Sequence, residues 1–400
     1  MTKRILMLGG SMQQIPCIVR AKEMGHYVIT CDYLPDNPGH KFADEYFNVS
    51  TTDKEKVLEL AEKLKIDGIV AYASDPAAPT AAYVSDKLEI PGNPYESVKI
   101  LTNKHLFREF LRSHNFNCPM SVFGSSYEEI ANGVSKLKFP IMVKPVDSSG
   151  SKGVVKIYSV DELKAAFDEA ISYSRSKIVI AEEFIVKKGY QVSGDGFSIN
   201  GKFVFSSYGN ELYSGNGTRE YVALGEFWPS LLTDEQKLKV DNEIQRLISE
   251  LEMKSCAYNI EVILDKDDNV YIIELGPRNG GSYIPQLIKY ATNVDLIDYT
   301  IKAAVGEDCG DLKMTPTTGF WSNYMILSKK DGIFDRIEFN EKFKNNNLLE
   351  CYCTANIGDE VHKYQNTTHS LGTILFNADS LDEMVNLIEN IDNCYRVVLK

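Results

Sequence analysis

Short apolar runs alternate with helical periodicity through the first ninety residues. Runs at residues 5–8, 27–31 and 68–72 are mostly aliphatic, which predicts three buried strands. Apolar positions three and four apart predict helices over residues 15–24 and directly after Asp53, a residue type that caps helix N-termini. The β-α-β-α-β order predicts a small parallel sheet with helices on both faces.

The pattern changes in the next hundred residues. A helical segment of mixed charge over residues 99–114 leads to strand-like runs at residues 141–144, 154–158 and 178–181. A helix is expected at residues 161–173, between the last two runs. This order is typical of an α+β unit.

Two β-hairpins are expected beyond this unit. The first spans residues 191–207 and turns at Asn200-Gly201, the strongest short hairpin signal in the chain. A long helix over residues 234–251 separates it from the second hairpin, which spans residues 257–275 and turns over residues 265–269. More strands and a final helix follow.

These elements predict a multidomain chain of α/β and α+β classes. The expected segments are a parallel βαβ domain, a helical linker, a small α+β unit, a larger unit that contains the second hairpin, and a C-terminal α+β portion, at residues 1–93, 94–119, 120–187, 188–310 and 311–400.

Charge and composition narrow the classes of function. The 400 residues carry 43 basic and 56 acidic side chains, a formal net charge of −13, which argues against nucleic-acid or anionic-membrane partners. No apolar run reaches the roughly 18 residues of a membrane span. The 8 cysteines are scattered and contain no C-x-x-C, so we expect reduced thiols in a cytoplasmic protein.

The first strand ends in a Gly9-Gly10 turn, and Asp32 follows the second strand. This arrangement resembles half of a dinucleotide-binding fingerprint, but the full G-x-G-x-x-G pattern is absent. An NAD-linked dehydrogenase is therefore an alternative that depends on this turn alone.

A loop rich in small residues follows the strand that delivers Lys144. Backbone N–H groups of such a loop can bind phosphate oxygens, and lysines add positive charge. The loop is not a P-loop, and an exposed Ser/Gly loop is the alternative. Its candidate phosphate-binding residues are Ser148, Ser149, Gly150, Ser151, Lys152 and Gly153.

The second hairpin carries two glutamates. Centring its turn on Asp267 and Asp268 places Glu261 opposite Glu274, where like charges repel. A divalent cation removes that repulsion, and Mg²⁺ prefers carboxylate and phosphate oxygens. Arg278 follows in a glycine-rich turn, where it can bind a phosphate or a carboxylate. A slipped register and a structural arginine are the alternatives.

The order of these motifs resembles the ATP-grasp superfamily, in its carboxylate–amine ligase branch. The resemblance implies an ATP-grasp fold behind an N-terminal parallel βαβ, Rossmann-like domain. It also implies that Lys104 and Lys144 contact ATP phosphates, that residues 147–154 cover them, and that Glu261 and Glu274 hold Mg²⁺ or Mn²⁺. Arg278 matches the arginine on the acyl-phosphate side. The segment that holds adenine is implied to be Glu182, Glu183, Phe184 and Ile185.

Two positions depart from the family pattern. Gln191 is the best counterpart of an acidic residue that binds ribose, and Gly276 stands where the family often has a metal-ligating asparagine. Gly276 leaves the second metal's coordination open, and with it a non-catalytic ATP-binding module.

The implied reaction uses small molecules only. A substrate carboxylate attacks the γ-phosphate of ATP, and an amine then displaces phosphate from the acyl phosphate. We expect an amino-acid or peptide-type ligase, with a phosphoribosylglycinamide synthetase-like purine enzyme as the alternative. Tyr213 and Arg219 are candidate substrate contacts in a Gly/Asn-rich loop, which could also be a plain surface loop. Family members are often dimers, so a homodimer is possible.

Overall fold

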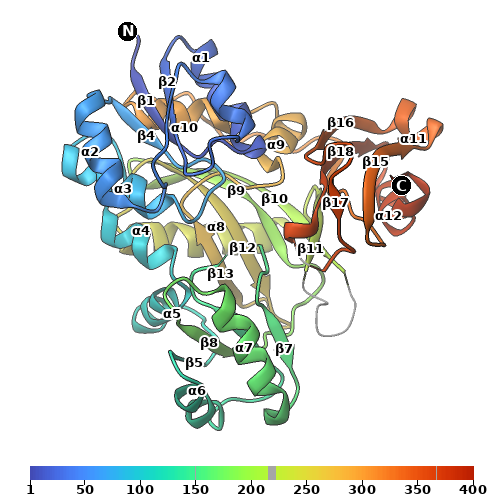
Figure 1. Ribbon diagram of the computed structural model, residues 1–400. Coiled ribbons are helices and arrows are strands. Elements are labelled where there is room, and N and C mark those ends of the chain that lie inside the picture. The colour runs from blue at the N-terminus through green and yellow to red at the C-terminus, as the bar shows by residue number, and fades with distance from the viewer. Residues whose placement is uncertain (149, 215–221, 366) are drawn as a thin grey trace.

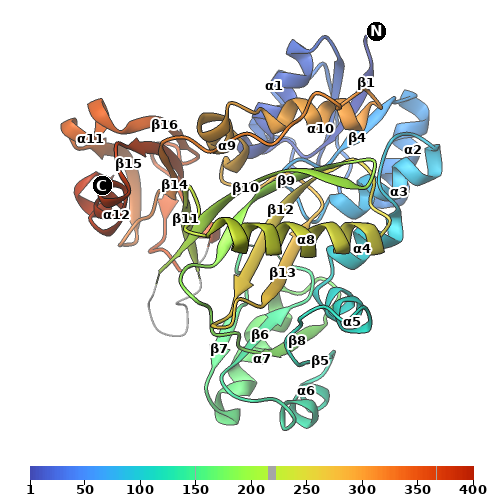
Figure 2. The same ribbon diagram turned by 180° about the vertical axis from the view of Figure 1, so that it is seen from behind.

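The structure, a computed structural model, describes residues 1–148, 150–214, 222–365 and 367–400. A large central sheet connects three outlying parts: the N-terminal region, a small sheet below it, and the C-terminal region to one side (Figure 1; seen from behind in Figure 2). The mixed α/β multidomain class predicted from the sequence is confirmed.

The N-terminal region is built on a parallel sheet of order β3-β2-β1-β4. Its strands are β1 (Arg4–Leu8), β2 (Tyr27–Cys31), β3 (Glu45–Phe47) and β4 (Gly68–Val70). Its helices are α1 (Ile15–Glu23), α2 (Lys54–Leu64) and α3 (Ala78–Leu88). Asp53 caps α2 as predicted, by accepting a hydrogen bond from the Lys56 amide.

A helix from much later in the chain completes this region. Ile297 and Ile301 of α10 (Leu296–Ala304) are buried against β1 and α1. Arg20 and Asp298 make a two-point ion pair between α1 and α10, at 2.5 and 2.8 Å. The N-terminal sheet is therefore fastened to the chain that follows the second hairpin.

The small unit is a four-stranded sheet of order β5-β8-β6-β7. Its strands are β5 (Ser121–Gly124), β6 (Ile141–Pro145), β7 (Val155–Ile157) and β8 (Val179–Glu183), with helices α6 (Tyr127–Val134) and α7 (Leu163–Tyr173). The predicted linker helix is two helices, α4 (Tyr95–Leu101) and α5 (Lys104–Ser113), because the chain leaves helical geometry at Asn103.

The central sheet has eight strands in the order β13-β12-β9-β10-β11-β14-β18-β16. They are β9 (Val192–Ile199), β10 (Lys202–Tyr213), β11 (Ala223–Trp228), β12 (Cys256–Leu264), β13 (Val270–Gly276), β14 (Phe320–Met325), β16 (Leu348–Cys353) and β18 (Gly372–Ala378). The β9–β10 hairpin turns at Asn200 and Gly201, which both have positive φ, as the sequence predicted. Helices α8 (Asp234–Glu250) and α9 (Ile284–Thr292) pack on this sheet.

The C-terminal region adds a three-stranded sheet of order β17-β15-β19. Its elements are β15 (Gly332–Phe339), β17 (Glu360–Val361), β19 (Tyr395–Leu399), α11 (Glu341–Asn346) and α12 (Leu381–Glu389). Within the described part of the chain, no helix combines the length and apolarity that crossing a membrane requires.

Candidate active site

A cleft of about 1000 Å³ lies between the small sheet and the central sheet. Many of the residues singled out from the sequence line it, from elements far apart in the chain. They are Lys104, Lys144, Ser148, Gly150, Ser151, Glu182, Glu183, Phe184, Ile185, Gln191, Tyr213, Glu261, Glu274 and Arg278. Of the remaining candidates, Lys152 and Gly153 are described but do not line the cleft, while Ser149 and Arg219 lie outside the described residues.

The second hairpin pairs Glu261 with Glu274, as the sequence predicted, but through a different register. Near the turn Leu264 pairs with Val270, which is one residue away from a turn centred on Asp267 and Asp268. A bulge at Ile273 then shifts the register by one and brings the two glutamates opposite each other. The bulge therefore aims both carboxylates into the cleft.

The two glutamates have different electrostatic surroundings. Lys104 donates from Nζ to Glu274 Oε2 at 2.9 Å and to the Ser148 carbonyl at 3.2 Å. Burial and the repulsion from Glu211 and Glu274 raise the pKa of Glu261 well above its ordinary value. A cation between Glu261 and Glu274 would relieve that repulsion.

Lys144 belongs to a buried three-residue ion cluster. Glu182 takes an ion pair from Lys144 and another from Arg108, whose Nε lies 2.9 Å from Glu182 Oε2. Burial opposes ionisation of Glu182, but Arg108 and Lys144 outweigh it and lower its pKa to about 2. The cluster holds the Lys144 side chain at the cleft. Arg108 was not predicted as a site residue, because it lies in the amphipathic helix α5 among other charged residues.

The small-residue loop is anchored at its start and touches the C-terminal region. Asp147 accepts hydrogen bonds from the Arg175 and Ser176 amides, at 3.1 and 2.7 Å. Further along, Thr367 Oγ1 donates to the Gly150 carbonyl at 2.8 Å. Gly153 has a φ of +70° and its Cα faces the Tyr173 ring, so the end of the loop packs on α7 rather than on the cleft.

The segment expected to hold adenine leaves strand β8 at the edge of the cleft. The Phe184 amide donates to the Pro140 carbonyl at 3.0 Å, and Lys156 Nζ lies 3.9 Å from the centre of the Phe184 ring. The ring of Phe184 is thereby fixed beside Ile185 on the cleft wall, a surface suited to a flat aromatic base.

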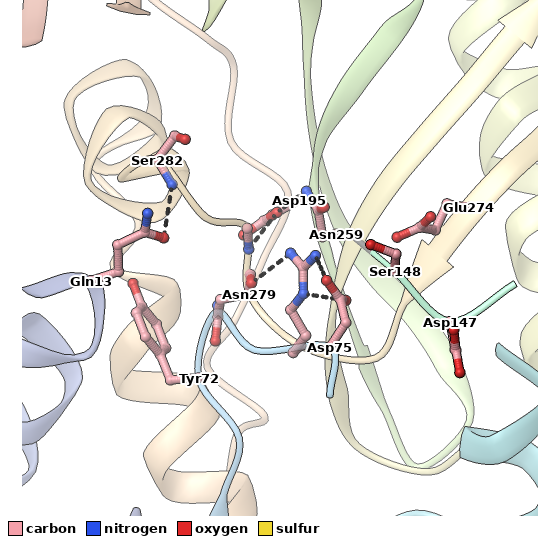
Figure 3. Close-up of polar contacts among 12 residues, drawn as sticks. Gln13, Tyr72, Asp75, Asp147, Ser148, Asp195, Asn259, Glu274, Asn279 and Ser282 are labelled. Carbon is pink, nitrogen blue, oxygen red and sulfur yellow. Dashed lines mark hydrogen bonds and ion pairs between the residues drawn. The ribbon is translucent and has the colours of Figure 1, made fainter. Parts of the chain in front are cut away.

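Asp75, from the loop after β4, holds Arg278 (Figure 3). The two Asp75 oxygens accept from Arg278 Nε and Nη2, both at 2.7 Å, and the Asn279 carbonyl accepts from Nη1 at 3.0 Å. Burial opposes ionisation of Asp75, but the guanidinium lowers its pKa. Within the described residues these contacts engage three of the five N–H groups of Arg278, which also lines the cleft.

Gly276 gives Asp75 the space for this contact. A Cβ on Gly276 would lie 3.1 Å from Asp75 Oδ1. The position where the family often has an asparagine is therefore approached by a carboxylate from the N-terminal sheet. Asp75 was not predicted as a site residue, because its Ser-Asp-Pro sequence is typical of an ordinary turn.

A second buried carboxylate supports the turn after Arg278. Asp195 accepts from the Gly280 amide at 2.8 Å and from Asn259 Nδ2 at 3.2 Å (Figure 3). Burial raises the pKa of Asp195 to about 7, although these hydrogen bonds oppose the rise. Ser282 and Tyr283, further along the same turn, both have positive φ, a strained backbone for residues with side chains.

Gln191 links the glutamate pair to a further acid. Its Nε2 donates to Glu211 Oε2 at 2.8 Å and to Glu261 Oε2 at 3.3 Å. Tyr213 also donates to Glu211 Oε2, at 2.6 Å. Glu211 was not predicted as a site residue, because the polar residues of β10 do not show which of its faces is buried.

Asp32, the candidate ribose-binding acid of the dehydrogenase alternative, is engaged locally. Its carboxylate accepts hydrogen bonds from the Gly10 and Leu34 amides and from Asn37 Nδ2, at 3.2, 3.1 and 2.8 Å. These bonds give Asp32 a structural role in the Gly9-Gly10 turn.

Among the described residues, the candidate metal ligands in the cleft are two carboxylates, those of Glu261 and Glu274. Groups of three or more His, Cys, Asp or Glu side chains with metal-binding geometry are absent from the part that the structure describes. Glu261 and Glu274 therefore suit an ion whose other ligands come from phosphate oxygens or water.

Comparison with protein families matches residues 137–286 to the ATP-grasp domain. A formate-dependent phosphoribosylglycinamide formyltransferase of Bacteroides thetaiotaomicron is 26% identical over 285 residues, 69% of this chain and 70% of that protein. The protein y4rH of Sinorhizobium fredii is 26% identical over 308 residues, 74% of this chain but 61% of its own length.

Solved structures share the fold over the whole chain. An L-amino acid ligase from Bacillus licheniformis has a TM-score of 0.84 and 22% identity, covering 100% of this chain and 99% of that chain. A phosphoribosylglycinamide synthetase from Anaerococcus prevotii has a TM-score of 0.77 and 24% identity, covering 100% of both chains. The ATP-grasp fold expected from the motifs is confirmed.

Proposed function

Since the chain belongs to the ATP-grasp superfamily, we propose that it is an ATP- and Mg²⁺-dependent ligase that joins a small-molecule carboxylate to an amine. The site residues named above are its nucleotide, metal and phosphoryl-transfer groups. The observation that carries the proposal is the cross-strand pair Glu261–Glu274, aimed into a cleft that Lys104, Lys144 and Arg278 also line.

The residues of the cleft fit both ATP and a divalent cation. Glu261 is half-buried beside Glu211 and Glu274, and its raised pKa reflects a charge that a cation or a proton can offset. When bound, Mg²⁺ would neutralise charge on the phosphate oxygens. Phe184 and Ile185 offer an apolar wall for the base, and Gln191 can hydrogen-bond a ribose hydroxyl if its amide turns away from Glu211.

The chain's own groups provide positioning and charge. Lys104 and Lys144 would bind phosphate oxygens, and the backbone of residues 147–154 would cover them. The substrate carboxylate attacks the γ-phosphorus and ADP leaves, while the N–H groups of Arg278 not held by Asp75 or Asn279 bind the oxygens of the transferring group. The closed loop then keeps water from the acyl phosphate until the amine displaces phosphate.

A screen for ADP and phosphate release tests this proposal. Amino acids and small acids are supplied as carboxylates, with and without an amine, in the presence of MgATP. Release that requires a carboxylate, and that an amine increases, is expected. ATP binding without release across a broad panel would favour a non-catalytic module instead.

A purine-type substrate is the second candidate. The formyltransferase relative and the synthetase structure both carry phosphoribosylglycinamide in their names. Adding formate with phosphoribosylglycinamide to the panel separates this candidate from an amino-acid ligase.

We also propose a cytoplasmic setting and a homodimer. All eight cysteines are free thiols, which suits a reducing compartment. Light scattering of the purified protein tests the dimer directly.

A further inference from the structure

Polar side chains cross one face of the central sheet, leading away from the glutamate pair. Glu261 lies opposite Ser193 on β9, and Glu211 on β10 lies opposite Glu226 on β11. Gln191 immediately precedes β9, and its carbonyl accepts a hydrogen bond from the Glu211 amide at 2.9 Å, so the extended pairing with β10 continues to Gln191. The side chains of Gln191 and Ser193, two residues apart along this extended chain, therefore leave the same face. We call Gln191, Ser193, Glu211 and Glu226 the acid row.

Among the residues that the structure describes, Glu211 and Glu226 have no ion pair like those that Arg108 and Lys144 make with Glu182. Glu226 Oε2 is buried and has no hydrogen-bond partner among the described residues. Gln191 Nε2 and the Tyr213 hydroxyl both donate to Glu211 Oε2, and Glu211 lines the cleft. Lys187, the basic residue whose charge acts on Glu211, lies over the Tyr213 ring, 4.6 Å from its centre.

Ser193 gives an independent sign of a missing ligand. Its side chain is 2% exposed, and its hydroxyl has no partner in the part of the chain that the structure describes. A buried hydroxyl without a hydrogen bond is costly, so such groups are usually paired in the working protein. This hydroxyl leaves the same sheet face as the carboxylates.

We propose that the acid row binds an ammonium group on the substrate whose carboxylate is activated. This inference rests on the proposed ligase function and names its substrate class: a zwitterion rather than a simple acid. An ammonium group carries the missing charge and donates three hydrogen bonds to carboxylate and hydroxyl oxygens. The described residues offer no group of three metal-binding side chains here, which favours an organic cation over a second metal ion.

One small molecule could contact both the phosphoryl-transfer groups and the acid row. A single amide nitrogen, Gln191 Nε2, bonds both Glu211 and Glu261, so the acid row begins directly beside the proposed metal pair. A zwitterion can therefore place its carboxylate at the phosphoryl-transfer end and its ammonium group on Glu211 and Glu226.

Matched substrate pairs test the inference. L-alanine is compared with propionate, and L-phenylalanine with 3-phenylpropionate, in ADP release and in calorimetric binding to the MgADP-loaded protein. We expect kcat/KM to favour the amino acids at least tenfold, and E226Q and E211Q each to reduce that preference at least tenfold. E235Q, on the exposed face of α8, is the control, and thermal unfolding checks that each variant is folded.

The outcomes separate this inference from the proposed function. Equal use of the deaminated acids, an unchanged preference in E226Q, or no binding or reaction of any amino acid would overturn the acid row as an ammonium site. The ligase proposal would survive if any carboxylate drove ADP release. Amino-acid binding that E226Q weakens, without ADP release from any carboxylate, would instead retain the ammonium site and overturn the ligase.

Discussion

The carboxylates at the two ends of the cleft differ in their partners and in the direction of their pKa shifts. At the nucleotide end, Glu182 is paired with Arg108 and Lys144, and Arg108 is only 1% exposed. At the far end, Glu211 lines the cleft and Glu226 lies opposite it on the neighbouring strand. Burial raises the pKa of each to about 8, with added repulsion from Glu226 on Glu211 and from Glu261 and Asp195 on Glu226, although a hydrogen bond with Asn323 opposes the rise at Glu226. The first arrangement is complete as the chain folds, whereas the second needs a charge from outside.

This difference distinguishes carboxylates that are paired within the folded chain from carboxylates that we propose are paired by a bound ligand. A paired buried carboxylate stabilises the fold, since removing one partner strands the other charge. An unpaired one costs stability until a cation or a proton arrives. Substitutions at the two ends should therefore change stability in opposite directions.

The largest effect is expected at Glu261 and Glu274, the two proposed metal ligands, which lie between the two ends of the cleft. Replacing Glu261 and Glu274 together by glutamine removes the charge that holds the cation, and we expect ATP turnover to fall about a thousandfold or more. Steady-state ADP release measures this. Turnover at the parent rate, in a variant that still binds ATP, would show that the metal lies elsewhere.

The second-largest effect is expected from removing the charge of Glu182, at the paired end of the cleft. E182Q leaves Arg108 and Lys144 without their buried partner, so we expect the free energy of unfolding to fall by about 3 kcal/mol at pH 7. The folded pKa of Glu182, about 2, lies below the ordinary 4.5, so its contribution is complete above pH 4.5 and is lost as the pH falls toward 2. Urea unfolding at pH 7 and pH 3 measures both effects. E183Q, on the neighbouring and more exposed residue, is the control, and equal losses in both variants would contradict the account.

Asp75 tests whether the N-terminal region works in the reaction. D75A frees Arg278 from its fixed orientation, and we expect kcat to fall about thirtyfold while the KM for ATP changes less than threefold. G276A should act in the same direction, because the added Cβ crowds Asp75 Oδ1. D298A is the matched control, since it removes a similar two-point pair with Arg20 away from the cleft. A kcat loss of equal size in D298A would reduce Asp75 to a structural link.

The smallest effect, and the one of opposite sign, is expected at the unpaired end. The folded pKa of Glu226, about 8, lies above the ordinary 4.5, so this group lowers stability increasingly as the pH rises from 4.5 to 8. We expect E226Q to raise the free energy of unfolding by about 1 kcal/mol at pH 8 and to leave it unchanged at pH 4.5. Destabilisation of the ligand-free variant at pH 8 would mean that Glu226 is already paired.

The sequence predicted elements better than it predicted the partners of charged groups. The strands, the Asn200-Gly201 turn and the Asp53 cap depend on local chemistry, and each is present. The pairing of Glu261 with Glu274 was predicted through a turn that is off by one, and the bulge at Ile273 restores it. No local pattern encodes that bulge.

Asp75 and Glu211 were missed for a different reason. Each acquires its role from residues that the fold brings beside it: Asp75 from Arg278, and Glu211 from Gln191 and from Glu226 on the neighbouring strand. Short β3 and helix α3 were also not predicted, because three residues of strand and an alanine-rich segment after two prolines give little periodicity.

The proposed ligase reaction begins with phosphorylation of a substrate carboxylate in this cleft. Oxygen transfer tests it most directly: the carboxylate that drives ADP release in the screen is prepared with ¹⁸O and supplied with MgATP and the amine. We expect one ¹⁸O atom in each inorganic phosphate released, because attack on the γ-phosphorus leaves the carboxylate oxygen on phosphate when the amine displaces it. Phosphate free of ¹⁸O, at the same rate of ADP release, would contradict the proposed reaction.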